Sequence, residues 1–134
     1  MNRIILKIFL FFLLLTSLIT SPILAQKEVP IDYSGIWTYD VKETPYGEFT
    51  GTFSLSKKED TYEGKIYNSE GKEFDLTIVR FRGNRMTIQS NIEEANSTFS
   101  GFFDGNTFVA RGEIEGDDFI YKLVAKRKTD ANSK

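Results

Sequence analysis

Apolar and polar residues alternate through short segments of the chain from Ser34 onward, and turn-forming residues separate one segment from the next. In the first segment Trp37, Tyr39 and Val41 fall on one face. A period of two is typical of a β-strand with one buried face, and no stretch of this region has the period of an amphipathic helix. The pattern therefore predicts an all-β domain.

The alternation predicts eight strands. The first two lie within Tyr33–Ser56, on either side of a loop at Thr44–Gly47. The other six are Thr61–Tyr67, Glu73–Phe81, Arg85–Ile92, Thr98–Phe103, Thr107–Ile114 and Asp118–Arg127. Hairpin-type turns are predicted at Ser69–Gly71, Gly83-Asn84, Gly105-Asn106 and Gly116-Asp117, because Gly and Asn accept a positive φ.

The shortness of these connections predicts the topology. Parallel strands need a crossover of a dozen or more residues, so strands joined by hairpins are antiparallel neighbours in chain order. A meander with one apolar face must close on itself or leave exposed edges that promote aggregation. We therefore expect an all-β, eight-stranded antiparallel up-and-down β-barrel over residues 34–128.

One hairpin requires an irregularity. A two-residue turn at Gly83-Asn84 places Phe81 opposite Met86, but Phe81 then conflicts in face with Ile78 of the same strand. A one-residue bulge between Ile78 and Phe81 reconciles the two faces.

Glycines recur in the middle of strands, in an aromatic–small–apolar pattern. Phe49-Gly51-Phe53, Tyr62-Gly64-Ile66 and Phe99-Gly101-Phe103 are examples. A mid-strand Gly weakens a flat sheet, so we expect sharp strand curvature, with a large neighbour covering each gap. A turn at Gly105-Asn106 predicts Phe99 opposite Gly112 and Phe103 opposite Phe108.

The N-terminal residues have the order of charges and apolar residues of a secretory signal peptide. Arg3 and Lys7 precede the apolar run Ile8–Leu15, and a small residue, Ala25, follows the helix breaker Pro22. Residues 1–25 are predicted to be the signal, 26–33 a linker and 129–134 a disordered tail. A secreted or periplasmic protein follows from this prediction. The alternative is an uncleaved N-terminal anchor, for which the run is short.

Composition excludes several classes of function. The chain has no Cys and no His, so disulfides, thiol nucleophiles, a Ser-His-Asp triad and histidine metal sites are excluded. The net charge of −2 provides no basic surface for nucleic acid or for a membrane after signal cleavage. The acids around the last hairpin, from Glu113 to Asp118, match no calcium loop. We expect no enzyme, no cofactor and no metal.

Gly35-Ile36-Trp37 lies on the first strand, and Arg127 ends the last. These two features resemble the signature of the calycin barrels, which are the lipocalins, the fatty-acid-binding proteins and the avidins, so the resemblance implies a lipocalin-like or avidin-like meander. The resemblance implies that Trp37 lies across the barrel floor with Arg127 packed over it, as a structural pair that closes the barrel. Arg127 has the same parity as Tyr121 and Leu123, so it can point inward.

The local likeness is strongest to avidin, over Gly35–Asp40 and Gly47–Phe53. The avidin pattern, however, has an Asn and a Tyr as polar contacts to biotin where this chain has Tyr39 and Phe53. A buried polar group without a partner costs about 1–3 kcal/mol. The resemblance therefore implies the architecture and not biotin binding.

The inward aromatic residues leave two alternatives open. They can line an apolar cavity or fill it, since the interior of eight strands is just wide enough for side chains to fill. The residues predicted to line a cavity are Tyr39, Phe53, Tyr62, Phe103, Phe108 and Tyr121. Tyr39, Tyr62 and Tyr121 would supply its polar groups, because a buried phenol normally has a hydrogen-bond partner.

The leading hypothesis is a secreted lipocalin-like barrel that binds a small apolar molecule near its open end. The alternative is a packed barrel that contacts a protein or a glycan through its outer surface. Phe102 and Val109 are predicted cross-strand neighbours on that surface, with Val124 or Ile120 nearby. A contiguous apolar patch there would suggest a homo-oligomer.

Overall fold

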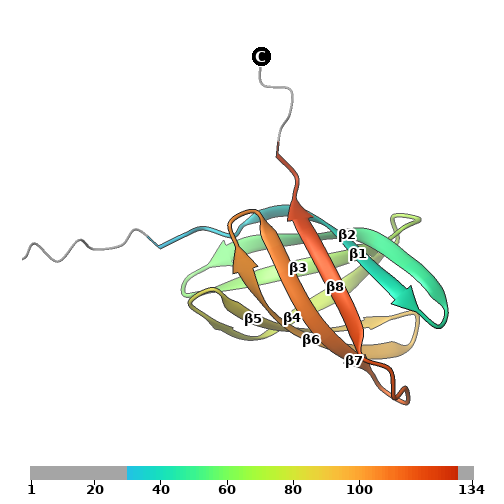
Figure 1. The fold of residues 1–134 in the computed structure, drawn as a ribbon. Helices are drawn as coiled ribbons and strands as arrows, with labels where there is room; N and C mark the ends of the chain where they lie inside the picture. The colour runs from blue at the N-terminus through green and yellow to red at the C-terminus, as the bar shows by residue number, and fades with distance from the viewer. Residues whose placement is uncertain (1–29, 130–134) are drawn as a thin grey trace, which may run out of the picture. The chain divides into compact units, whose positions relative to one another are not determined.

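The computed structural model describes residues 30–129, which contain a closed barrel of eight antiparallel strands in chain order (Figure 1). The strands are β1 (Gly35–Thr44), β2 (Gly47–Lys58), β3 (Thr61–Asn68), β4 (Glu73–Arg82), β5 (Arg85–Ile92), β6 (Ala95–Asp104), β7 (Thr107–Ile114) and β8 (Tyr121–Arg127). The all-β up-and-down barrel predicted from the sequence is confirmed. The described residues include no helix that is long and apolar enough to span a membrane.

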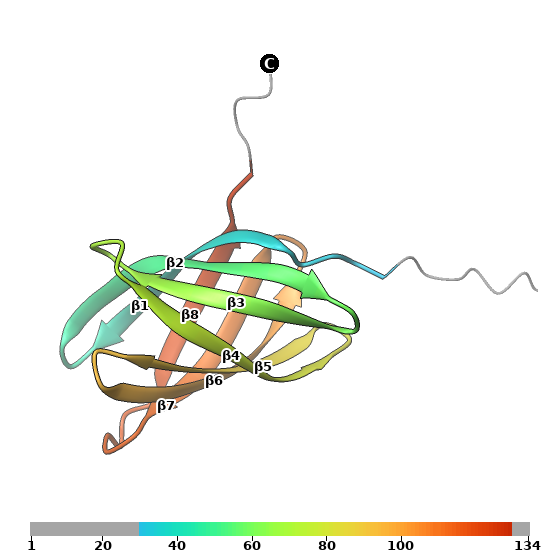
Figure 2. The ribbon, with the colours of Figure 1, turned by 180° about the vertical axis from the view of Figure 1, so that it is seen from behind.

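The barrel closes where the first strand meets the last. β1 pairs with β8 from Trp37 opposite Arg127 to Val41 opposite Leu123. The reverse view shows the sheet continuing around the other side, through β2, β3 and β4 (Figure 2). The ends of the barrel domain are fastened at this seam, where Lys128 N donates a hydrogen bond to Ile36 O at 2.7 Å.

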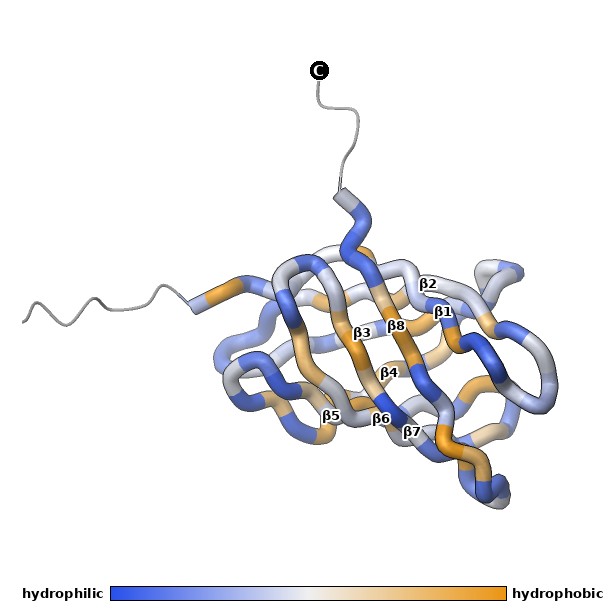
Figure 3. The backbone as a smooth tube through the Cα atoms, viewed as in Figure 1, coloured by the Kyte–Doolittle hydropathy of each residue, from blue (hydrophilic) through white to orange (hydrophobic). Residues whose placement is uncertain are grey.

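The side chains alternate between buried and exposed as the sequence predicts, for example in β1, where Trp37, Tyr39 and Val41 are buried. Figure 3 shows hydrophobic and hydrophilic residues interspersed along the strands. The inward positions form one core of buried apolar residues, which includes Trp37, Phe53, Ile88, Phe108 and Leu123. Large side chains cover Gly51, Gly64 and Gly112, as expected, whereas Gly101 lies against the backbone of Val109 and against Ala110. A Cβ at Gly112 would collide with the ring of Phe99, which lies directly across the ladder.

The predicted bulge in β4 is confirmed. Ile78 pairs with Ile88 and Phe81 pairs with Met86, with a shift of register between Ile78 and Arg80. The extra residue, Val79, points outward and is 53% exposed. β1 has a second irregularity that the sequence analysis did not foresee, between Val41 and Thr44.

The last connection is wider than the predicted turn at Gly116-Asp117. The β7–β8 ladder ends where Gly112 pairs with Tyr121, so β8 begins at Tyr121 and not at Asp118. The physical reason is the Asp117 carboxylate, which accepts hydrogen bonds from Phe119 N at 3.0 Å and from the Tyr121 hydroxyl. These bonds hold the loop in a conformation that does not pair with β7.

The predicted signal peptide, residues 1–25, and the tail beyond Thr129 lie outside the described residues, as do residues 26–29 of the predicted linker. Tyr33 was predicted to be the last residue of the linker. In the structure it is 4% exposed and belongs to the core.

Candidate ligand-binding cavity

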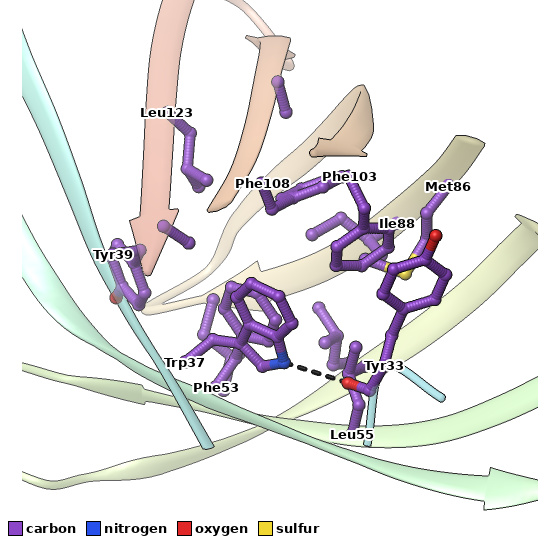
Figure 4. Close-up of a cluster of buried hydrophobic side chains, with 14 of the residues drawn as sticks. Tyr33, Trp37, Tyr39, Phe53, Leu55, Met86, Ile88, Phe103, Phe108 and Leu123 are labelled. Atoms are coloured by element: carbon purple, nitrogen blue, oxygen red, sulfur yellow. Dashed lines mark hydrogen bonds between the residues drawn. The ribbon is translucent and has the colours of Figure 1, made fainter. Parts of the chain in front are cut away.

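One end of the barrel is filled by aromatic side chains, and we call it the closed end. Tyr33 stacks on Phe103 with ring centroids 4.1 Å apart, and Phe103 contacts Phe108 at 4.6 Å and Trp37 at 5.1 Å. Figure 4 shows Trp37, Phe53, Phe103 and Phe108 converging in the barrel interior, with Tyr33 beside Phe103. This end is a packed aromatic core.

Trp37 and Arg127 meet at the closed end. The Arg127 guanidinium carbon lies 4.9 Å from the centroid of the Trp37 ring, within the range of a cation–π contact. Arg127 Nη2 donates to Asp32 O at 2.9 Å, and Trp37 Nε1 donates to Tyr33 O at 3.0 Å. The two side chains thus hold the segment before β1 against the end of the barrel.

The opposite end, which we call the open end, contains a cavity of about 470 Å³. Its inner wall is mainly apolar and includes Val41, Ile66, Ile88, Phe99, Ile114 and Leu123. Its mouth lies among the β1–β2, β3–β4 and β5–β6 connections, where it is bordered by Glu48, Glu70 and Glu93. A cavity of about 300–1,000 Å³ with a mostly apolar wall is typical of small-molecule sites.

Two of the six predicted cavity residues line this cavity. They are Tyr39 and Tyr121. The other four, Phe53, Tyr62, Phe103 and Phe108, lie in the aromatic cluster that fills the closed end. Tyr62 Oη accepts a hydrogen bond from Tyr33 N at 3.0 Å. Ligand binding by the two lining tyrosines stays a prediction.

The hydroxyl protons of both lining tyrosines are used within the protein. Tyr39 Oη donates to Tyr67 O at 3.0 Å, and Tyr121 Oη donates to Asp117 Oδ2. Burial raises the pKa of Tyr39. The hydrogen bond to Asp117 raises the pKa of Tyr121 to about 12, and the same bond lowers the pKa of Asp117. Both phenols are therefore neutral near pH 7.

Two serines that the sequence analysis did not single out form a polar patch in the cavity wall. Ser90 Oγ and Ser97 Oγ are 2.9 Å apart, and Ser97 Oγ lies 3.3 Å from Ser90 O. Ser97 is only 7% exposed. The signal that could have identified them is their inward parity, since Ser90 follows Ile88 by two residues and Ser97 precedes Phe99 by two.

A second depression, a groove of about 740 Å³, is bordered mostly by polar side chains such as Gln89, Asn91, Asn96 and Thr98. We place the candidate site in the smaller cavity because its lining is apolar, as that of small-molecule sites generally is. No group of three or more acidic side chains among residues 30–129 is arranged to hold a metal ion.

The predicted outer neighbours are adjacent in the structure. Phe102 pairs with Val109, and Val109 pairs with Val124, so the three form a row across β6, β7 and β8. Phe102 is 43% exposed and Ile120 is 52% exposed. The homo-oligomer through this row stays a prediction.

No protein-family model and no curated protein matches the chain in sequence. Among solved structures, the chain resembles a de novo designed fluorescence-activating β-barrel, with 20% sequence identity and a TM-score of 0.52. The match covers 72% of this chain and 94% of the designed one. At this identity the likeness shows the fold alone. A closed antiparallel barrel is supported, whereas membership of the calycin group is not shown.

Proposed function

We propose that this barrel binds a small apolar molecule in the cavity at its open end. The observation that carries the proposal is the division of the interior, in which aromatic side chains fill one end and leave about 470 Å³ unfilled at the other. Removing apolar ligand surface from water contributes roughly 25 cal/mol per Å², so an apolar wall of this kind favours an apolar occupant.

The sequence supports a secreted or periplasmic location for this binding, through the signal peptide predicted at residues 1–25. A carrier or scavenger of apolar molecules outside the cytoplasm is the corresponding role. We propose binding and not catalysis, because the phenols in the cavity, Tyr39 and Tyr121, both have raised pKa values and stay protonated near neutral pH. A tyrosine base would require a lowered pKa.

The test uses a neutral apolar fluorophore, N-phenyl-1-naphthylamine, whose emission rises when it leaves water. The wild-type protein is expected to give a saturable rise with one site. Val41→Phe places a larger side chain into the cavity from β1 and should weaken the binding at least about tenfold, the loss of about 1.4 kcal/mol of binding energy.

The matched control is Ile36→Phe on the same strand, because Ile36 is 49% exposed and points away from the interior. It should bind the fluorophore as the wild type does. A rise that does not saturate in the wild type, or one that is equal in Val41→Phe, would refute a ligand site in the cavity.

A further inference from the structure

We infer that the ligand of the cavity carries a positively charged, hydrogen-bond-donating group, such as a protonated amine, on an apolar body. The inference rests on the proposed function and identifies the class of molecule that the cavity selects. It follows from two independent observations. One is the kind of hydrogen bond that the cavity wall can still make, and the other is the charge around its mouth.

Four hydroxyls of the cavity wall already donate their protons within the protein. The hydroxyl proton of Tyr39 goes to Tyr67 O and that of Tyr121 to Asp117. In the serine pair, a proton from Ser97 to Ser90 O leaves the proton of Ser90 for Ser97 Oγ. A hydroxyl that already donates retains its oxygen lone pairs, which can accept a further hydrogen bond, so ligand groups that donate are matched to these four hydroxyls. The lining also contains donors at Thr50, Asn68 and Ser69, and Asn68 Nδ2 donates to Glu93 Oε1 at 3.4 Å.

The mouth is acidic. The charged residues that line the cavity are Glu48, Glu70 and Glu93, and no lysine or arginine is among the described residues that line it. A carboxylate ligand would face these three groups without a cationic partner. An ammonium group, in contrast, would find carboxylates of opposite charge at the exit of an apolar cavity, where interactions are less screened than in bulk water.

Further charged residues lie close to the mouth in the chain. Glu43 lies near the end of β1 and Glu94 in the β5–β6 connection, while Lys42 lies in β1 and Lys72 in the β3–β4 connection. Lys72 Nζ lies 5.3 Å from the centroid of the Phe74 ring. Neither lysine is among the residues that line the cavity, whereas three glutamates are.

The test compares three molecules that have the same tail, namely decylamine, decanol and decanoate, by isothermal titration calorimetry at pH 7. An alkylamine is protonated at this pH, as lysine is. With three rim carboxylates acting on it, decylamine should bind about tenfold tighter than decanol, and decanoate should bind weaker than decanol. Raising the salt from about 20 mM to about 500 mM should reduce the advantage of decylamine and leave decanol unchanged, because salt screens exposed charges.

The variant with Glu48→Gln, Glu70→Gln and Glu93→Gln removes the rim charges at exposed positions and should bring decylamine to within about threefold of decanol. The matched control changes the net charge equally at the closed end, with Glu59→Gln, Asp60→Asn and Asp104→Asn, and should keep the wild-type preference. Saturable binding of decanol together with decanoate bound as tightly as decylamine would overturn this inference and leave the proposed function standing. No saturable binding of any of the three would refute the proposed function itself.

Discussion

The two ends of the barrel are built from the same eight strands and differ in what they enclose. At the closed end, Tyr33, Trp37, Phe103 and Phe108 pack with ring centroids 4.1–5.1 Å apart. At the open end, serines and aliphatic residues stand among the aromatic residues of the wall, and a cavity remains. The barrel geometry is common to both ends, so the size of the inward side chains decides whether the interior of an eight-stranded barrel is a core or a binding site.

The largest expected contrast between the ends is in stability. Phe108 is 0% exposed and contacts Phe53 and Phe103, so Phe108→Ala should lower the free energy of unfolding by about 3–5 kcal/mol. Phe49→Ala is the matched change at the mouth. Phe49 is 45% exposed, and its removal should cost less than about 0.5 kcal/mol. Urea unfolding measures both, and equal losses would mean that the two ends are equally well packed.

A smaller effect is expected from Gly112, the glycine covered by Phe99, whose ring lines the cavity. Gly112→Ala places a methyl group where the Phe99 ring now lies, which should cost about 1–3 kcal/mol and press the ring into the cavity. The free energy of unfolding in urea and the affinity for the neutral fluorophore should therefore both decrease. In the double variant with Phe99→Ala, the methyl group should cost almost nothing. Additive losses of free energy would contradict this account of the pair.

The smallest effect is a pH dependence at the open end. The folded pKa of Tyr121 is about 12, against 10.0 for an ordinary tyrosine. Because the folded value is the higher one, the hydrogen bond to Asp117 stabilises the fold fully below pH 10, and this contribution is lost as the pH rises from 10 to 12. Tyr121→Phe should be less stable than the wild type at pH 9, and the difference should shrink by pH 12.

Urea unfolding across this range measures the difference, and tyrosinate absorbance reports the titration directly. Asp117→Asn removes the anionic acceptor, so it should lower the pH at which the Tyr121 phenolate forms. On the acid side, the pKa of Asp117 is lowered, so its contribution is present above pH 4 and lost as the pH falls through the folded value. A difference between Tyr121→Phe and wild type that is constant from pH 9 to pH 12 would argue against the hydrogen bond.

Local patterns were enough to predict the architecture. The alternation and the hairpin turns predicted the meander, and the conflict of faces predicted a bulge between Ile78 and Phe81, where the structure has it at Val79. The pairing of Phe103 with Phe108 also followed from counting outward from Gly105-Asn106. These features depend on neighbours within one hairpin, and the chain therefore encodes them over a few residues.

Beyond one hairpin, the sequence predicted the closure of the barrel, and the resemblance implied the contact of Trp37 with Arg127, but other long-range features were not predicted. Tyr33 precedes the alternating region, so nothing in the local pattern indicates that it folds back onto Phe103, and the loop held by Asp117 likewise resembles an ordinary turn. The division of the aromatic residues between the two ends could, however, have been predicted from the sequence. Every second turn of a meander lies at the same end, and Tyr62, Phe81, Phe103 and Phe108 all lie next to turns at the closed end.

The seam at the closed end has a practical consequence. Asp32, at the entry to β1, and Arg127, at the exit from β8, are joined by a hydrogen bond, so the chain enters and leaves the barrel on the side away from the mouth. A label, a fusion partner or a sensor surface attached through either route thus leaves the mouth of the cavity accessible. A short peptide joining these two positions would also permit circular permutation, with new ends cut into one of the other turns of the closed end.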